Sequence, residues 1–219
     1  MGKTTLRTIE SFDITGEGGE IYHGGDQRWF SKEFRKEAAC GATTCANILG
    51  YMARADEGLS GLADFDLKSK AGFLSFMEAV YPCVRPGFIG IMPADYTRGL
   101  DEFTSTGNFK CETETLTVPG SKQSRPTPGK VLRFIGDSLE KDIPVAFLNL
   151  SSGRVKNLEG YHWVTIAAID EDGLIATIID NSRRLEVNLD KWLKKTTLGG
   201  AFVRAEIQPV SKNRNHRED

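Results

Sequence analysis

The spacing of apolar residues in this chain changes near residue 142, and that change constrains the fold more than any other feature. Before it, apolar residues recur every three or four positions, as at Cys45, Ile48 and Met52, which is typical of one face of a helix. After it, short apolar runs rich in β-branched residues alternate with turn residues, as strands do. Helices followed by strands predict an α+β fold with a helical part at about 27–142 and a β part at about 143–208.

The same patterns predict the individual elements. Thr127 followed by Pro128 has the form of an N-cap and a first helical residue. We expect helices over 41–58 and 67–80, after Pro93 and from Pro128, and a short one at 190–195. We expect strands around 116–118 and over 143–150, 161–169, 174–179, 185–189 and 203–207.

Length and composition favour one globular domain. The chain has 219 residues, so we predict a single domain over 1–210 followed by a polar tail at 211–219. With 28 basic and 30 acidic residues, the net charge of −2 gives no support for a nucleic-acid surface. No apolar run approaches the roughly 20 residues of a membrane span, and the first residues do not form a secretory signal. We therefore expect a cytoplasmic protein without a nucleic-acid or membrane partner.

The cysteines do not predict a metal site. Cys40, Cys45, Cys83 and Cys111 include no Cys-x-x-Cys pair, and the chain has only three histidines. Nothing marks the chain for export, so reduced thiols are expected. We predict no metal and no organic cofactor.

Cys40 stands directly before the first strong helical pattern and is followed by Gly41. A thiol at a helix N-terminus lies near unpaired N–H groups and the positive end of the helix dipole, which favour the nucleophilic thiolate. A glycine after it leaves room for a substrate. Cys45 points about 140° away from Cys40 at about 100° per residue, on the apolar face, so we interpret Cys45 as a core residue.

His162 is the candidate base for such a thiolate. Histidine titrates in the range that proton transfer requires. Of the three histidines, only His162 lies in a strongly predicted element, at the start of a strand, where a rigid scaffold holds it.

The orienting partner of His162 is expected on the next strand. A three-residue turn with Gly173 in the left-handed conformation pairs Asp170 with Leu174. Asp180 then lies on the face of His162 and Asn181 on the opposite face. A two-residue loop or a bulge reverses this parity and gives the role to Asn181.

Three stretches together resemble papain-like cysteine peptidases. They are Ala39 to Asn47, which begins Ala-Cys-Gly, then Tyr161 to Ile166, which reads Tyr-His-Trp-Val-Thr-Ile, and Ile178 to Asn181. The bacterial branch that processes double-glycine leader peptides is the most similar. The resemblance implies a papain-like fold in which a helical lobe packs on an antiparallel sheet, with a nucleophile at Cys40, a base at His162 and an orienter at Asp180.

Two further points depend on the resemblance. The family uses a Gln shortly before the nucleophile in its oxyanion hole, and Gln27, thirteen residues before Cys40, is the nearest upstream Gln. Gln27 can take part in the oxyanion hole only if residues 28–39 loop out as a helical turn. Papain itself uses the later Cys of a Cys-Gly-x-Cys pattern, which leaves Cys45 as an alternative nucleophile.

The resulting hypothesis is a cysteine-dependent peptidase or amidase that acts on a peptide or protein through a thioester. An acyltransferase or deamidase on the same site is the close alternative, and a non-catalytic binding module with this fold is the other. Residues 60–127 match no known pattern, and we expect substrate choice to lie there.

Overall fold

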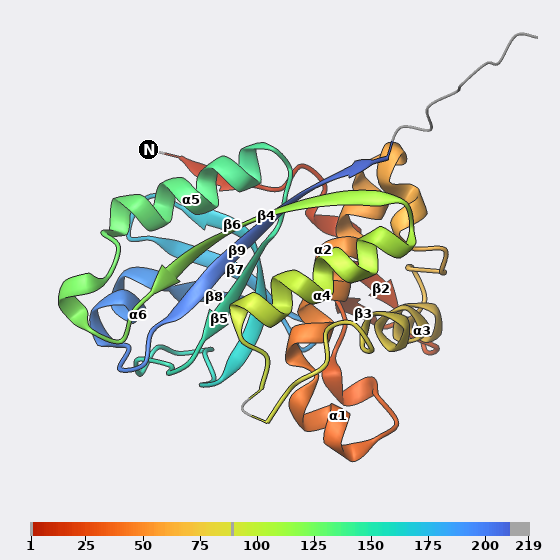
Figure 1. Ribbon diagram of the computed structural model, residues 1–219, viewed down its shortest axis with the longest axis horizontal. Helices are drawn as coiled ribbons and strands as arrows, with labels where there is room; N and C mark the ends of the chain where they lie inside the picture. Colours follow the sequence, from red (N-terminus) through yellow and green to blue (C-terminus); the bar gives the residue numbers. More distant parts are fainter. Residues whose placement is uncertain (1, 89, 211–219) are drawn as a thin grey trace, which may run out of the picture.

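The computed structural model describes residues 2–88 and 90–210, so the predicted tail at 211–219 lies outside the described residues. A lobe of helices lies beside a twisted antiparallel sheet (Figure 1). The buried apolar residues of both parts form one connected cluster that runs from Leu6 to Ile207. The predicted α+β class, with a helical lobe packed on an antiparallel sheet, is confirmed.

The helices follow the predicted spacing closely. The α-helices are α1 Glu33–Ala38, α2 Cys40–Ala55, α3 Lys70–Val80, α4 Pro93–Thr106, α5 Pro128–Glu140 and α6 Leu189–Lys195. Short 3-10 helices are η1 Ile9–Phe12, η2 Gln27–Trp29, η3 Glu57–Leu62 and η4 Lys122–Ser124. Thr127 caps α5 as predicted, because its hydroxyl accepts from the Lys130 N–H.

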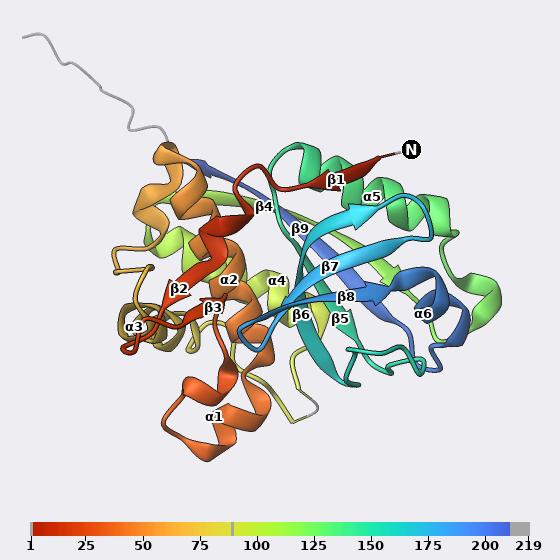
Figure 2. The same cartoon turned by 180° about the vertical axis from the view of Figure 1, so that it is seen from behind.

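The main sheet has the strand order β4-β9-β5-β6-β7-β8, and β1 pairs with β6. Every pairing between its named strands is antiparallel. The strands are β1 Lys3–Thr5, β4 Phe109–Val118, β5 Val145–Asn149, β6 His162–Asp170, β7 Ile175–Asp180, β8 Arg183–Asn188 and β9 Gly200–Pro209. A separate hairpin of β2 Asp13–Thr15 and β3 Ile21–His23 lies near α2 (Figure 2).

The sheet takes strands from the first half of the chain, so the predicted boundary near residue 142 does not separate helix from sheet. The strand expected around 116–118 is the end of the longer β4, which pairs with β9 from Phe109↔Pro209 to Val118↔Gly200. Most of β4 is an exposed edge, with Lys110, Glu112 and Glu114 facing solvent. The sequence there lacks an apolar face, which is why the pattern predicted only its buried end.

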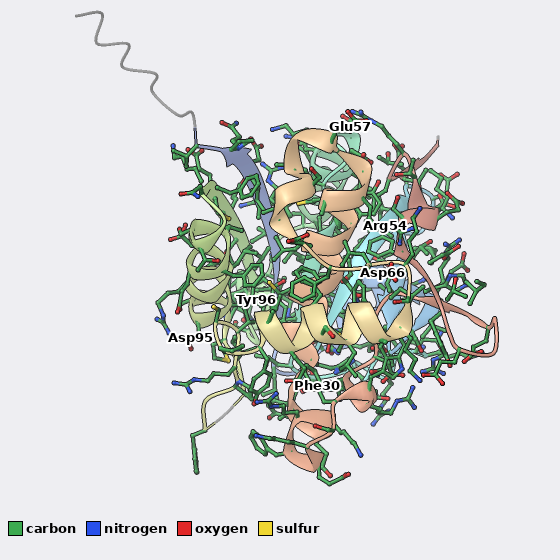
Figure 3. All side chains as sticks on the ribbon, turned by 90° about the vertical axis from the view of Figure 1, so that its right-hand side faces the viewer. Phe30, Arg54, Glu57, Asp66, Asp95 and Tyr96 are labelled. Atoms are coloured by element: carbon green, nitrogen blue, oxygen red, sulfur yellow. The ribbon has the colours of Figure 1, made fainter. Side chains whose placement is uncertain are left out.

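Helix α2 connects the two lobes. Its residues from Gly41 to Met52 are all buried, and it packs against α3 on one side and against β6 on the other. It ends at Ala55, three residues before the predicted Gly58, because the Asp56 side chain accepts from the Gly58 N–H and starts η3. Figure 3 looks onto the helical lobe, with α3 in front and Phe30 below it. A helix buried on all sides holds its first residue, Cys40, in a fixed place between the lobes.

None of the helices in the described part of the chain is long and apolar enough to cross a membrane.

Candidate active site

Cys40 is the first residue of α2, so the helix begins one residue before the predicted start at Gly41. Ala39 leaves the helical conformation, with φ −93° and ψ 20°, and thereby separates α1 from α2. The Cys40 N–H has no acceptor among residues 2–88 and 90–210, as is usual for a first helical turn. The thiol is half-buried and unpaired. It lines both a small inner pocket and a larger open groove.

Gly41 serves packing and does not make room for a substrate, which corrects the sequence interpretation. Gly41 is buried, and a Cβ on it would lie 2.5 Å from Ile91 Cγ2 and 3.6 Å from Trp163 Cδ1. Any side chain would push the loop that carries Ile91 away from α2. The glycine therefore lets the start of α2 approach both that loop and β6.

The inner pocket brings His162 and Asp180 next to Cys40. Cys40, His162 and Asp180 line a space of about 10 Å³, which is barely enough for one water molecule. His162 Nε2 lies 2.7 Å from Asp180 Oδ1, and both side chains are buried. Because Nε2 faces the carboxylate, Nδ1 is the ring nitrogen left for the cysteine. The expected hydrogen bond between His162 and Asp180 is confirmed.

The surroundings of His162 strongly favour its charged form. Burial alone lowers its pKa, but the hydrogen bond to Asp180 and the interaction with Cys40 raise it more. The net result raises the pKa of His162 to about 10. The ring is therefore an imidazolium at neutral pH, held between the Asp180 carboxylate and the Cys40 sulfur.

The register that joins His162 and Asp180 arises differently from the prediction. Asp170 pairs with Ile175 rather than Leu174, so the turn is one residue longer than expected. A β-bulge between Ile166 and Ala168 then shifts the register back, so that Thr165 pairs with Ile179. The two shifts cancel. The predicted face for Asp180 is correct, although the predicted turn is wrong.

Asn181 takes a turn position. Asn181 and Ser182 both have positive φ, 44° and 60°, and link Asp180 to its partner Arg183. A two-residue hairpin loop with left-handed residues at both positions is a type I′ turn, which Asn tolerates well. Asn181 lines the inner pocket, but the hydrogen bond to the imidazole comes from Asp180.

Gln27 lies in the wall of the same pocket, thirteen residues before Cys40 in sequence. The intervening chain forms the rest of η2 and the short helix α1, the helical detour that the prediction required. Gln27 Oε1 and Thr43 Oγ1 are buried there without a hydrogen-bond partner among the described residues. Buried polar atoms without partners are rare, so this pocket suits a polar ligand.

Sequence reasoning missed the residues that hold Gln27 in place. Asn47 Oδ1 on α2 accepts from the Gly25 N–H at 2.7 Å, and the Ser182 N–H donates to the Gly25 carbonyl at 3.1 Å. The segment before Gln27 is thus tied to the helical lobe and to the turn beside Asp180. The available signal was Asn47 itself, because a polar residue within an apolar helix face indicates a buried hydrogen bond.

A groove of about 380 Å³ opens on the other side of Cys40. Its walls are mainly apolar and include Leu148, Leu150 and Tyr161. Trp163 also lines the groove, and its indole N–H donates to the Ile91 carbonyl at 3.0 Å. The groove gives a substrate access to the cysteine.

The other cysteines and histidines do not share this arrangement. Cys45 is fully buried and burial raises its pKa strongly, so its place in the core is confirmed. Burial also raises the pKa of Cys111, to about 11. His23 pairs with Asp13 at 2.7 Å in the β2–β3 hairpin, which has no cysteine. In residues 2–88 and 90–210, no group of three or more potential ligands could hold a metal ion.

Comparisons with known proteins give similarities to solved structures only. No model of a protein family matches the chain, and no curated protein matches it. The chain is similar to the N-terminal peptidase C39-like domain of the toxin secretion ATP-binding protein from Vibrio parahaemolyticus, with 13% identity and a TM-score of 0.36 over 75% of this chain and 97% of that one. It is also similar to the Pseudomonas avirulence protein AvrPphB, with 12% identity and a TM-score of 0.38 over 80% of this chain and 95% of that one.

Such distant similarities cannot assign a function, so the functional argument depends on the side-chain geometry. The chain is an α+β protein whose helical lobe and antiparallel sheet meet at Cys40, His162 and Asp180.

Proposed function

We propose that this protein is a cysteine-dependent hydrolase of peptide or amide bonds that acts through a thioester. The observation that carries the proposal is the inner pocket, where a cysteine at a helix start lies beside a buried histidine bonded to an aspartate at 2.7 Å. A nucleophile, a base and an orienting group in contact form the arrangement that covalent acyl transfer requires. No step needs a metal or an organic cofactor.

In the first half of the reaction, Cys40 gives its proton to His162 and attacks the carbonyl carbon as the thiolate, so that a carbon–sulfur bond forms. The carbon–nitrogen bond then breaks, and the His162 imidazolium gives its proton to the departing amine. The high pKa of His162 keeps this proton in place at neutral pH until the amine takes it. The product of this half is a thioester on Cys40 and a free amine.

In the second half, His162 takes a proton from water, and the resulting hydroxide attacks the thioester. Acylation removes the negative charge from Cys40, which is one of the groups that raise the pKa of His162. Losing this contribution lowers the pKa of His162 in the acyl-enzyme, so the ring can remain neutral after it has given up its proton and can accept one from water. The carbon–sulfur bond breaks, the acid leaves, and the sulfur departs as a thiolate beside the His162 imidazolium, which restores the starting pair.

The developing oxyanion needs two donors, and the pocket offers two. The Cys40 N–H belongs to the first turn of α2, where backbone N–H groups have no acceptor within the helix, and Gln27 lines the same pocket. Preorganised donors of this kind each contribute roughly 10²–10³ in rate. We assign Gln27 and the Cys40 backbone to this role.

The first test is thiol reactivity. Iodoacetamide at pH 7, followed by mass spectrometry of the digest, should label Cys40 first, because a thiol beside an imidazolium and at a helix start reacts readily. Cys45 should stay unlabelled while the protein is folded. His162→Ala should slow the labelling of Cys40. If Cys40 reacts no faster than Cys83 and Cys111, the site is a binding module rather than an enzyme.

The second test is turnover on a mixed library of peptide, isopeptide and primary-amide substrates, with Cys40→Ala as the control. Release of an amine by the wild type alone supports the hydrolase. If added amines receive the acyl group in preference to water, the protein is an acyltransferase. If ammonia is the only amine released, it is a deamidase.

A further inference from the structure

A second hollow lies where the loop between β5 and β6 meets the end of α6. It measures about 560 Å³. Three cationic side chains line it, those of Arg154, Lys191 and Lys195, together with Ser152 and Thr197. None of its lining residues carries a carboxylate. We call this hollow the basic pocket.

The three cations have no carboxylate partner in the described part of the chain, whereas the next lysine on the same helix has one. Lys194 pairs with Asp190 at 2.5 Å, and no ion pair joins Arg154, Lys191 or Lys195 to an acid among residues 2–88 and 90–210. Like charges gathered at one concave surface repel each other and attract an anion. The basic pocket therefore favours a negatively charged ligand.

The two elements that carry the cations are held together firmly. Ser151 Oγ accepts from the Thr197 N–H at 2.8 Å, and the Trp192 indole N–H donates to the Ser151 carbonyl at 3.0 Å. Gly153 packs so closely on α6 that a Cβ would lie 3.0 Å from the Thr196 nitrogen. A ligand thus meets a preformed arrangement and does not have to order the loop.

The lysines are not needed to neutralise the end of α6. Lys and Arg near a helix C-terminus commonly serve the free carbonyls there. Here Arg125 does so from another segment, donating to the carbonyls of Leu193 and Thr196 at 2.6 Å each. Lys191 and Lys195 are therefore free to bind a ligand, and Arg125 adds a further positive charge nearby.

The basic pocket and the groove at the cysteine are lined by residues that are neighbours in the chain. Leu150 lines the groove, and the next residue, Ser151, lines the basic pocket. A peptide bound along the groove at Cys40 would therefore have the cations within reach of its neighbouring residues. We propose that the basic pocket binds the carboxylate of an acidic side chain in the substrate, a few residues from the scissile bond. This inference rests on the proposed hydrolase function and names a charge preference for it.

The test is direct binding, because binding does not require turnover. Fluorescence anisotropy should show that a short fluorescein-labelled oligo-glutamate binds more tightly than the matching oligo-glutamine. The triple variant Arg154→Gln, Lys191→Gln and Lys195→Gln should weaken the binding of oligo-glutamate about tenfold, as expected for three solvent-exposed charge contacts. Lys194→Gln, on the same helix and outside the pocket, is the matched control and should leave the affinity unchanged.

Equal affinity for the two peptides, or an equal loss with Lys194→Gln, would overturn the proposal. Displacement of oligo-glutamate by millimolar inorganic phosphate at constant ionic strength would overturn it in favour of a phosphate ligand. Cys40→Ala should bind oligo-glutamate as the wild type does. An unreactive Cys40 in a protein that still selects oligo-glutamate would thus contradict the hydrolase function and leave the anion site standing.

Discussion

Asp180 shows how one residue combines a chemical and a structural role. Its carboxylate is only 6% exposed and accepts the hydrogen bond from His162 Nε2. It fixes which ring nitrogen faces Cys40 and raises the pKa of the imidazole. Removing it therefore changes both the reaction and the stability of the site.

The first prediction at this scale compares Asp180→Ala with Asn181→Ala. Asp180→Ala should lower turnover by about 10²–10⁴, because the imidazole loses its orientation and its charge partner. It should also lower the free energy of unfolding by about 1–3 kcal/mol, because Nε2 is left buried without a partner. Asn181→Ala should change turnover much less. Turnover and urea denaturation of both variants measure this, and a greater loss of turnover for Asn181→Ala would give the orienting role to the amide.

A second prediction concerns pH. The pKa of His162 is raised from 6.5 to about 10 in the folded protein, so the folded state binds this proton more tightly than the unfolded state does. The resulting stabilisation is complete below pH 6.5 and is lost as the pH rises through about 10. The free energy of unfolding should therefore fall across this window, as urea titrations at a series of pH values can measure.

The control for the pH prediction is His162→Gln. In this variant the free energy of unfolding should not show the fall with pH that is due to His162. Cys40→Ser should keep part of it, because Asp180 still holds the ring. A wild-type stability that stays flat through the window would contradict a charged His162.

At the scale of elements, the segment from Gly24 to Gln27 links the two lobes beside the site. Gly24 has φ +79°, and a Cβ there would lie 2.5 Å from Ile179 Cγ2 on β7 and 2.9 Å from Asn47 Oδ1 on α2. Only a glycine lets the backbone pass between the helix and the sheet at this point. The hydrogen bonds of Gly25 to Asn47 and Ser182 then set the position of Gln27.

We predict that Gly24→Ala lowers the free energy of unfolding by roughly 2–4 kcal/mol, from the left-handed backbone together with the close contacts. Gly19→Ala is the matched control, because Gly19 has φ +85° but nothing within 4 Å of a Cβ. It should cost only about 1 kcal/mol. Similar losses for the two variants in chemical denaturation would show that the close approach of Gly24 to Ile179 and Asn47 is unimportant.

At the scale of the whole molecule, the two lobes share one core. Helix α2 is buried between the helices and β6, and the buried apolar residues form a single connected cluster. Neither lobe can therefore lose its packing without exposing the other. The active site lies at this junction and depends on both lobes.

We predict one cooperative unfolding transition. A variant that keeps only Trp29 reports on the segment beside the helical lobe, and a variant that keeps only Trp192 reports on the sheet side. Their fluorescence should give the same urea midpoint, and far-UV circular dichroism should give that midpoint too. Two separate midpoints would mean that the lobes unfold independently.

The sequence by itself determined the features that depend on local chemistry. Helical spacing located α2 and, to within one residue, its start at Cys40. The Thr127–Pro128 pair located the start of α5, and apolar runs located β5, β6 and β7. The face of Asp180 was also predicted, but the predicted turn was one residue short and the β-bulge restored the parity. A bulge is set by the packing of neighbouring strands, and its position is not encoded by the turn residues alone.

Only the tertiary structure decided the features that join distant segments. The edge strand β4 owes its length to pairing with β9, since its own exposed residues lack an apolar face. Gly41 meets Ile91, Asn47 meets Gly25, and Gln27 reaches the pocket of Cys40 because helices fill the residues between them. These contacts arise where the two lobes close on each other, and the spacing of residues along one segment carries no information about which residues another segment brings to it.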